Sequence, residues 1–195
     1  VTINRFCSAG VQAVAMAADR IRLGEADVMI AAGVESMSMV PMMGNKIAFN
    51  HAVFEKDENI AIAYGMGLTA EKVAEQWKVT REAQDEFALQ SHQRAIKAIE
   101  KGEFKDEISP YQIAERVPDM EIGEVKVRSK LATQDEGPRG DTSLEALAKL
   151  KTVFAQKGSV TAGNSSQLSD GAAAVLLVSE AALKRYNLTP IGKFL

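Results

Sequence analysis

Cys7 is the one cysteine of this 195-residue chain, and its position favours nucleophilic chemistry. It stands directly before a segment that carries no charged residue until Asp19, a pattern typical of a helix buried in a core. At the start of such a helix, unpaired backbone N–H groups and the positive end of the helix dipole favour a thiolate over a thiol. A thiolate can attack a carbonyl carbon and hold an acyl group as a thioester. The alternative interpretation is that Cys7 is a small buried hydrophobic residue.

The composition argues against several other classes of function. The formal net charge is -3, which disfavours a nucleic-acid binder because neutralising a phosphate backbone requires a basic surface. A single cysteine cannot form an internal disulfide, which fits a reducing compartment. No run of 18 apolar residues occurs, so we expect no membrane span. His51 and His92 have no partner at metal-ligand spacing, so we expect no metal site and interpret both as surface or structural residues.

A strand, a helix and a second strand are predicted around Cys7. Residues 1–4 favour a short strand, and residues 8–23 are apolar nearly all round, as in a buried helix that ends at Gly24. Residues 27–33 form a continuous apolar run, the pattern of a strand buried on both faces. We therefore expect two parallel strands joined by a right-handed helical crossover.

The middle of the chain is more polar. Helices are predicted over 69–77 and 81–101, and the second begins after Thr80 as N-cap and ends at Gly102. Its apolar stripe is expected to repeat every four residues, from Ala83 through Phe87 to Ile99.

The later segments return to an apolar character. Residues 103–141 are expected to be mostly loop, with a short strand at 124–129. Thr142 and Glu145 have the spacing of a capping box and predict a helix that starts there. The apolar run at 172–179 predicts a buried strand, followed by a helix to residue 186 and a final strand near 190.

Four sequence segments resemble the thiolase family, the acyl-CoA acyltransferases that cleave or join 3-ketoacyl-CoA. They are NRFCSAGVQAVAMAADRIRLGEADVMIAAGVESMSMVP, YGMGLTAEKVAEQW, TREAQDEFALQSHQRA and GSVTAGNSSQLSDGAAAVLLVSEAAL. The resemblance implies an α/β fold of the layered thiolase type, part of its N-terminal half, with a long inserted CoA-binding loop domain. It places the nucleophile core at 1–36, the loop domain at 37–167, the return to the core at 168–189 and the start of the C-terminal half at 190–195.

The resemblance also implies a mechanism. Cys7 would attack the 3-keto carbon of a 3-ketoacyl-CoA and release acetyl-CoA, and CoA would then remove the acyl group; the reverse Claisen condensation uses the same intermediate. Backbone N–H groups, including that of Cys7, would stabilise the oxyanion. The segment MGLTAE is more similar to the degradative, β-oxidation type of thiolase. Coenzyme A is expected as a co-substrate, with no permanently bound cofactor.

Five further site residues follow from the resemblance: Ser166 and Met66 beside the pantetheine, Gly163 and Asn164 in the turn that holds Ser166, and Arg139 near the CoA nucleotide. Ordinary turn chemistry, loop packing and solvation are the alternative explanations for these residue types. Residues 126–157 contain seven Lys or Arg against four Asp or Glu, a local positive charge that suits a phosphate-bearing co-substrate. Gly65 stands where short-chain biosynthetic thiolases carry a histidine, which fits longer acyl chains.

The expected partners are acyl-CoA and CoA, without nucleic acid or a membrane span, and the parent protein is expected to be a homodimer or homotetramer. In a bacterium its location would be the cytoplasm. The family's general-base histidine, second cysteine and oxyanion-hole asparagine would all follow Leu195, and both chain ends look like those of a piece of a longer protein.

Two rival interpretations remain open. A decarboxylating condensing enzyme of the ketoacyl-synthase type also has a cysteine at a buried helix start, but the long insertion argues against it. A non-catalytic thiolase-like protein that binds acyl-CoA or lipid is disfavoured by the setting of Cys7.

We expect the isolated 195-residue chain to be inactive and poorly folded, because it lacks part of the catalytic set and the helix after Cys7 lacks packing partners. Thiolysis of acetoacetyl-CoA by the purified chain measures this, with Cys7→Ala as the control. Activity above that control would contradict the prediction.

Overall fold

The computed structural model describes residues 1–42 and 44–195, without the side chain of residue 59, and the chain forms two compact units. The first unit consists of Val1–Ala48 and Leu168–Leu195, and the second of Phe49–Gln167. The fold class is α/β, as the sequence predicts. The sequence predicts boundaries after residues 36 and 167, whereas the units change after residues 48 and 167.

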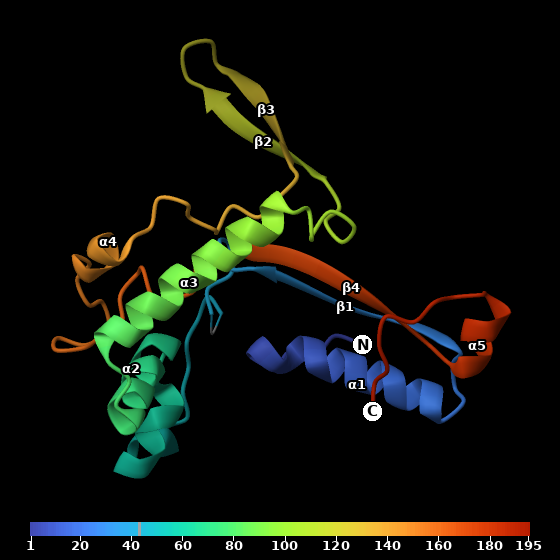
Figure 1. Ribbon diagram of the computed structural model, residues 1–195, viewed down its shortest axis with the longest axis horizontal. Coiled ribbons are helices and arrows are strands. Elements are labelled where there is room, and N and C mark those ends of the chain that lie inside the picture. Colours follow the sequence, from blue (N-terminus) through green and yellow to red (C-terminus); the bar gives the residue numbers. More distant parts are fainter. Residues whose placement is uncertain (43) are drawn as a thin grey trace. The chain divides into compact units, whose positions relative to one another are not determined.

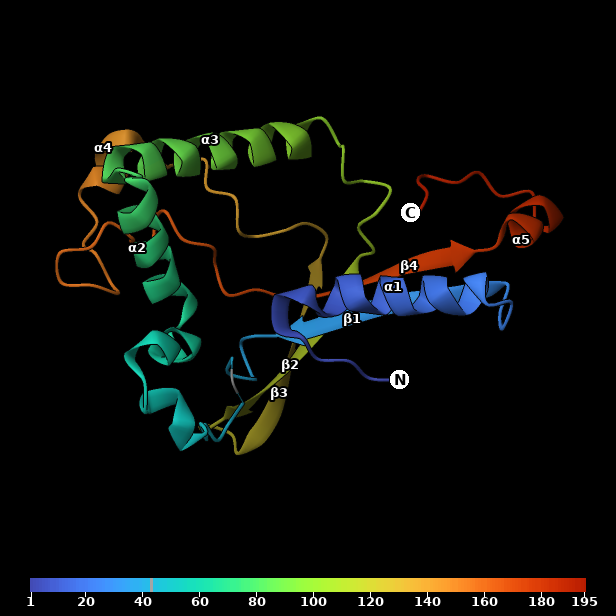
Figure 2. The same cartoon turned by 90° about the horizontal axis from the view of Figure 1, so that it is seen from below.

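The first unit is built on an antiparallel pair of strands. Strands β1 (Val28–Ser36) and β4 (Asp170–Val178) pair along their whole length, from Val28 opposite Val178 to Ser36 opposite Asp170. Helix α1 (Ala9–Arg22) packs along this pair, after the short 3₁₀ turn η1 (Phe6–Ser8), and α5 (Glu180–Arg185) follows β4 (Figures 1 and 2). The buried residues of this unit are all alanines, which let backbones approach closely: Ala17, Ala18, Ala31 and Ala182.

Two predicted strands of the first unit are wrong. Residues 1–5 and residues 190–195 lie in no strand, and the partner of β1 among the described residues is the antiparallel β4. The expected parallel pair with its right-handed crossover is therefore absent from the described part of the chain. An extended segment becomes a strand only where a neighbouring edge accepts its hydrogen bonds, and sequence pattern does not say where that edge is.

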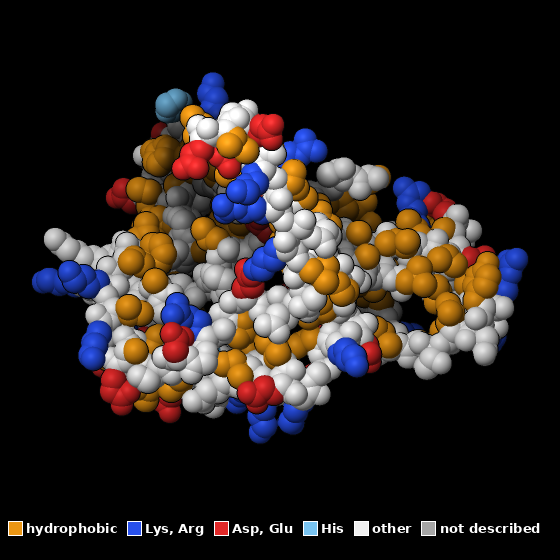
Figure 3. All heavy atoms as spheres, turned by 90° about the horizontal axis from the view of Figure 1, so that it is seen from above, with side chains coloured by type: hydrophobic (Ala, Val, Ile, Leu, Met, Phe, Trp, Pro, Cys, Tyr) orange, Lys and Arg blue, Asp and Glu red, His pale blue; other side chains and the backbone are white. Residues whose placement is uncertain are grey.

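Two burial predictions are also wrong: that the segment of β1 is buried on both faces, and that β4 is a buried strand. Ile30 and Leu176 lie directly opposite each other, and their exposed fractions are 68% and 54%. Val34, two pleats along the same face, is 81% exposed. The surface in Figure 3 carries many hydrophobic side chains between its charged ones. An apolar strand pattern therefore shows that both faces of a strand can be buried. In this chain α1 covers one face of the β1–β4 pair.

Three helices and two 3₁₀ segments shape the second unit. They are η2 (His51–Phe54), η3 (Asp57–Ala63), α2 (Met66–Trp77), α3 (Arg81–Glu100) and α4 (Leu144–Ala148). The predicted caps of α3 are confirmed: the Thr80 hydroxyl accepts a hydrogen bond from the Ala83 N–H, and Gly102 has a φ of +73°. Among the helices of the described residues, none is long and apolar enough to cross a membrane.

The same C-terminal motif closes α1 and α3. After α3, the Gly102 N–H donates to Ile99 and the Glu103 N–H to Ala98, at 2.9 and 3.0 Å. After α1, Gly24 with φ +73° is the corresponding residue. A positive φ is cheap for glycine, so both helices end where the sequence predicts.

The predicted apolar stripe of α3 is wrong in its first half. Phe87 is 69% exposed, and the inward face instead carries Asp85, His92 and Ile96. These three residues follow the i, i+7, i+11 spacing of one helix face. The inward face of α3 therefore carries two titratable residues, Asp85 and His92, whose contacts are described below.

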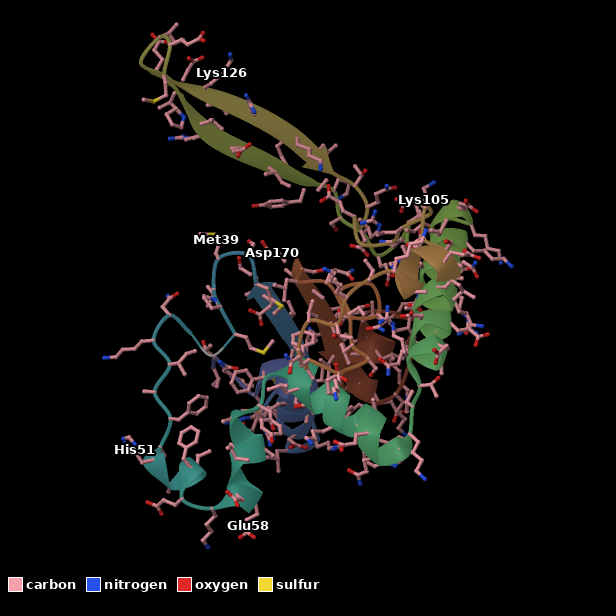
Figure 4. All side chains as sticks on the ribbon, turned by 90° about the vertical axis from the view of Figure 1, so that its left-hand side faces the viewer. Met39, His51, Glu58, Lys105, Lys126 and Asp170 are labelled. Carbon is pink, nitrogen blue, oxygen red and sulfur yellow. The ribbon has the colours of Figure 1, made fainter. Side chains whose placement is uncertain are left out.

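A two-stranded hairpin occupies much of the region expected to be loop. The strand predicted at 124–129 is confirmed within β3 (Glu124–Ala132), but its partner β2 (Tyr111–Asp119) was not expected. Tyr111, Ile113 and Val117 alternate with polar residues, the signal that could have identified β2. The hairpin extends away from α3 in Figure 1, and Figure 4 labels its residue Lys126.

The N-cap of α4 lies one residue later than predicted. Ser143, and not Thr142, accepts the hydrogen bond from the Ala146 N–H, at 3.2 Å. Adjacent Thr and Ser are equivalent as capping residues, so the sequence alone does not decide between them.

A polar contact fastens the end of the β1–β4 pair. The Ser38 N–H donates to Asp170 Oδ1 at 2.9 Å, and the Ser38 hydroxyl donates to Asp170 Oδ2. Hydrogen bonds from the Ser38 hydroxyl and N–H hold the pKa of Asp170 below its ordinary value. Figure 4 shows Asp170 near Met39, where the chain leaves β1.

Replacing Thr80 with Ala removes the side-chain acceptor at the start of α3. We expect a loss of about 1 kcal/mol in the free energy of unfolding. Urea unfolding of the protein followed by circular dichroism measures it. Thr80→Ser keeps the hydroxyl and should behave like the wild type; equal midpoints for the Ala and Ser variants would contradict this.

Candidate functional site

Cys7 lies on a tight turn that leads into α1. The Asn4 side chain accepts a hydrogen bond from the Phe6 N–H at 3.0 Å, and Phe6 has a left-handed backbone with φ +51°. The Ser8 N–H then donates to the Arg5 carbonyl at 3.1 Å. A positive φ is unusual for a bulky side chain. These features place Cys7 within η1 immediately before the helix, and its side chain is exposed.

The start of α1 is well suited to an anion. Within the described residues, Ser8 makes no side-chain capping hydrogen bond at this helix, and the first turn holds no acidic residue. The 3₁₀ turn uses the Ser8 N–H and the Ala9 N–H, which donate to the Arg5 and Phe6 carbonyls, and the exposed Cys7 lies in this turn at the positive end of the helix dipole. The side chain of Cys7 is exposed in this chain, which is compatible with the nucleophile interpretation.

The second unit contains a cavity of about 640 Å³. Its polar wall includes His92, Arg139, Asp141 and Ser165. Its apolar wall is formed by Ala146, Leu147, Leu150 and Ala162. Two of the predicted site residues, Arg139 and Gly163, line this cavity together.

Arg139 is exposed and already paired. Its guanidinium donates to both carboxylate oxygens of Asp141, at 3.2 and 3.0 Å, and this pairing holds the pKa of Asp141 below its ordinary value. The Arg139 N–H donates to His92 Nδ1 at 3.1 Å. A phosphate binding here would share the Arg139 guanidinium with the Asp141 carboxylate.

The turn at residues 161–166 is held mainly by Asn164. Its amide group donates to Asp85 Oδ1 and to the Ser159 carbonyl, and its oxygen accepts from the Thr161 N–H at 2.7 Å. Both amide hydrogens of Asn164 are thus engaged. Asn164 therefore orders the turn, and the sequence did not predict these hydrogen bonds.

The neighbours of Asn164 have different environments. A Cβ at Gly163 would overlap the ends of the Leu147 and Leu150 side chains, so a larger residue there would require both leucines to shift. Ser165 donates to the Thr161 carbonyl at 2.6 Å and lines the cavity. Ser166 is exposed, and its hydroxyl makes a long 3.4 Å contact to the Gln167 carbonyl.

Met66 is the first residue of α2 and is 60% exposed. It is not among the described residues that line the cavity. The adjacent Gly67 lies against the ring of Phe154, which packs where a side chain would otherwise be. The structure therefore groups Arg139, Gly163 and the 161–166 turn around the cavity and leaves Met66 outside that group.

His92 is a residue whose place the sequence did not reveal. The sequence interprets it as a surface or structural residue; in the structure it is half-buried, accepts the Arg139 N–H and lines the cavity. Its spacing of seven residues from Asp85 on α3 was an available signal. Within the described residues, no three His, Cys, Asp or Glu side chains gather as metal ligands would.

Glu71 ties α2 to the segment that precedes the turn. Its carboxylate accepts hydrogen bonds from the Ser159 and Val160 N–H groups, both at 2.9 Å at their shortest, and from the Ser159 hydroxyl at 3.1 Å. Partial burial favours the protonated form, but these hydrogen bonds outweigh it and hold the pKa of Glu71 below its ordinary value. Glu71 thus connects α2 with the base of the turn.

Fold and site together define a class: an α/β protein with an exposed cysteine at the start of a helix, and a second unit with a charged cavity. The family description "Thiolase, N-terminal domain" matches residues 1–181. The chain therefore belongs to the thiolase family.

Similar proteins agree with this assignment. The chain is 46% identical to the 3-ketoacyl-CoA thiolase of Bacillus subtilis, over 100% of the chain and 49% of that protein. It is 46% identical to the human peroxisomal 3-ketoacyl-CoA thiolase, over 98% of the chain and 44% of that protein. The chain spans about half the length of the curated relatives it matches.

Solved structures match over the same share. The dimeric peroxisomal thiolase of Saccharomyces cerevisiae has a TM-score of 0.77 at 36% identity, covering 95% of this chain and 45% of that one. Human mitochondrial 3-ketoacyl-CoA thiolase in complex with CoA has a TM-score of 0.74 at 36% identity, covering 96% and 47%. The layered α/β fold of this chain is therefore of the thiolase type.

Replacing Glu71 with Gln should destabilise the protein by about 2 kcal/mol, because hydrogen bonds to a charged acceptor are among the stronger ones. The folded-state pKa is lowered, so the contribution is full above the ordinary glutamate pKa of about 4.3 and is lost as the pH falls through the lower folded value. The wild type should therefore lose stability relative to Glu71→Gln as the pH is lowered through that window.

Urea unfolding at a series of pH values measures this difference. Glu75→Gln, on an exposed position of the same helix, is the matched control and should leave the midpoint nearly unchanged. A Glu71→Gln difference that stays constant from neutral pH to pH 3 would count against the assigned role.

Proposed function

We propose that the protein is an acyl-CoA acyltransferase that carries its acyl group on Cys7. The observation that supports this most strongly is the exposed Cys7 side chain in the turn directly before α1, in a chain of the thiolase family. Relatives named 3-ketoacyl-CoA thiolase and acetyl-CoA acetyltransferase support the same reaction class. The reaction proposed is thiolytic cleavage of a 3-ketoacyl-CoA, as in fatty-acid β-oxidation, or the reverse condensation.

The chemistry proceeds in two halves. The Cys7 thiolate attacks the 3-keto carbon, and the bond between C2 and C3 breaks. The electron pair leaves on C2 as the enolate of acetyl-CoA, which takes up one proton from an acid expected beyond Leu195. The acyl group remains on Sγ as a thioester until a CoA thiolate attacks its carbonyl, releasing acyl-CoA and the Cys7 thiolate.

The turn before α1 supports this assignment. The positive end of the α1 dipole would favour negative charge on an attacking group in this turn. Once the thioester has formed, the same region can donate to the oxyanion of the tetrahedral intermediate. Preorganised donors of this kind give large rate effects, because they need no rearrangement during the reaction.

We assign CoA binding to a loop domain at residues 37–167, which includes the second unit (Phe49–Gln167). Residues 168–189 are assigned as the return to the core and 190–195 as the start of a C-terminal half. Arg139 and Gly163 line the cavity of the second unit, and Ser166 presents an exposed hydroxyl on the adjoining turn. Arg139 would contact the CoA phosphates, Ser166 and Met66 the pantetheine, and Asn164 would shape the turn between them. His92 joins this set because it holds the Arg139 backbone.

CoA enters as a co-substrate, and the expected assembly is a homodimer or homotetramer. One structural relative is described as dimeric and another as a complex with CoA. We propose that the isolated 195-residue chain is inactive, because the remaining acid–base groups are expected after Leu195.

The test is intact-mass measurement of the protein, expressed from its complete gene, after incubation with a 3-ketoacyl-CoA in the absence of free CoA. We expect a mass increase equal to the acyl group, localised to Cys7 and reversed by added CoA. Cys7→Ala should gain no mass. A non-covalent complex without acylation would favour the rival acyl-CoA or lipid-binding function, and neither adduct nor complex would reject both.

A further inference from the structure

We propose that Asp85 is a positioning residue for CoA: its buried carboxylate fixes the 161–166 turn that presents Ser166. This inference rests on the proposed function, because it assumes that the turn contacts CoA. Asp85 lies on α3, 79 positions before Asn164 in the sequence, and a hydrogen bond of 2.9 Å joins the two side chains.

The carboxylate of Asp85 is 4% exposed and is held from both sides. Arg81 Nε donates to Asp85 Oδ2 at 2.7 Å, one helical turn away. Asn164 Nδ2 donates to the other oxygen, Oδ1. The two oxygens therefore link a cation on α3 to an amide on the turn.

Arg81 extends this link to α4. Its Nη2 atom donates to the carbonyls of Leu147 and Leu150, at 2.6 and 3.1 Å, at the C-terminal end of that helix. Leu147 and Leu150 also line the cavity. One buried ion pair thus connects the apolar wall of the cavity with the turn on its polar side.

Asn164 transmits this constraint along the turn. It lies between Gly163 and Ser165, which both line the cavity, and directly precedes the pair Ser165–Ser166. Its oxygen holds the Thr161 N–H, and Thr161 in turn accepts from Ser165 through its carbonyl. A shift of the Asp85 carboxylate would therefore move the whole turn.

Stability alone does not explain a buried charge here. Well-packed apolar residues of similar volume often stabilise a core as much as a buried ion pair, because removing two charges from water is costly. The ion pair does supply directional, charge-assisted hydrogen bonds, which fix positions more strictly than apolar contacts do. Loss of the charge should therefore reduce the precision of the turn and weaken CoA binding.

The test compares Asp85→Asn with the wild type, both expressed from the complete gene. We expect the KM for CoA to rise about tenfold. A change of this size corresponds to the lower end of the free-energy range for a hydrogen bond to a charged group. The alkylation rate of Cys7 by iodoacetamide, which needs no CoA site, should stay unchanged and reports that the first unit is intact. Glu86→Gln, the next residue of α3 and exposed, removes the same charge and should leave both values unchanged.

Asp85→Glu serves if Asp85→Asn fails to fold. It keeps the charge beside Arg81 but moves the oxygens by one methylene group, so a positioning role predicts a raised KM for CoA and a purely electrostatic role predicts the wild-type value. A wild-type KM in every folded Asp85 variant would overturn the inference.

Ser166→Ala separates this failure from failure of the proposed function. If Ser166→Ala raises the KM for CoA while the Asp85 variants do not, CoA contact by the turn stands and the role of Asp85 falls. If Ser166→Ala also has no effect, and wild-type Cys7 takes no acyl group, the proposed function itself falls, and the role of Asp85 falls with it.

Discussion

The hydrogen-bonded carboxylate of Asp85 is the constraint on which the second unit depends. It is buried, accepts a hydrogen bond from Arg81, and is bonded to Asn164, a side chain that organises the 161–166 turn. Breaking such a pair leaves an uncompensated charge in a medium that solvates it poorly. Helix α3, helix α4 and the turn are therefore fixed with respect to one another by a few directional bonds, and the cavity takes its shape from them.

The two units handle negative charge by the same means, namely backbone and side-chain donors arranged before any ligand arrives. In the first unit, among the residues that the structure describes, the start of α1 has neither a side-chain cap nor an acidic residue, and Cys7 lies in the turn directly before it. In the second, Ser159 and Val160 N–H groups already hold the Glu71 carboxylate, and Arg139 holds Asp141. Preorganised donors of this kind stabilise charge without reorganisation.

The sequence predicted features that depend on neighbouring residues, but it did not predict features that depend on residues far away in the chain. The ends of α3 at Thr80 and Gly102 and the end of α1 at Gly24 depend on chemistry within a few residues, and all three are as expected. The strand at residues 1–4 and the two-sided burial of β1 depend on partners far away in the sequence, and both expectations were wrong. Cys7 was proposed from its local sequence context. Asp85 and Glu71 instead form hydrogen bonds with residues that lie 79 to 89 positions away, and hydrophobic periodicity cannot predict contacts over that separation.

The left-handed backbone of Phe6 has a consequence for which sequences this position tolerates. An L-residue in that region carries a steric cost of about 1–2 kcal/mol, and a β-branched side chain carries more. Isoleucine, valine and threonine are thus poor substitutes there, while glycine and asparagine fit the backbone without strain. The choice of amino acid at the position before Cys7 is therefore narrowed by a backbone torsion angle.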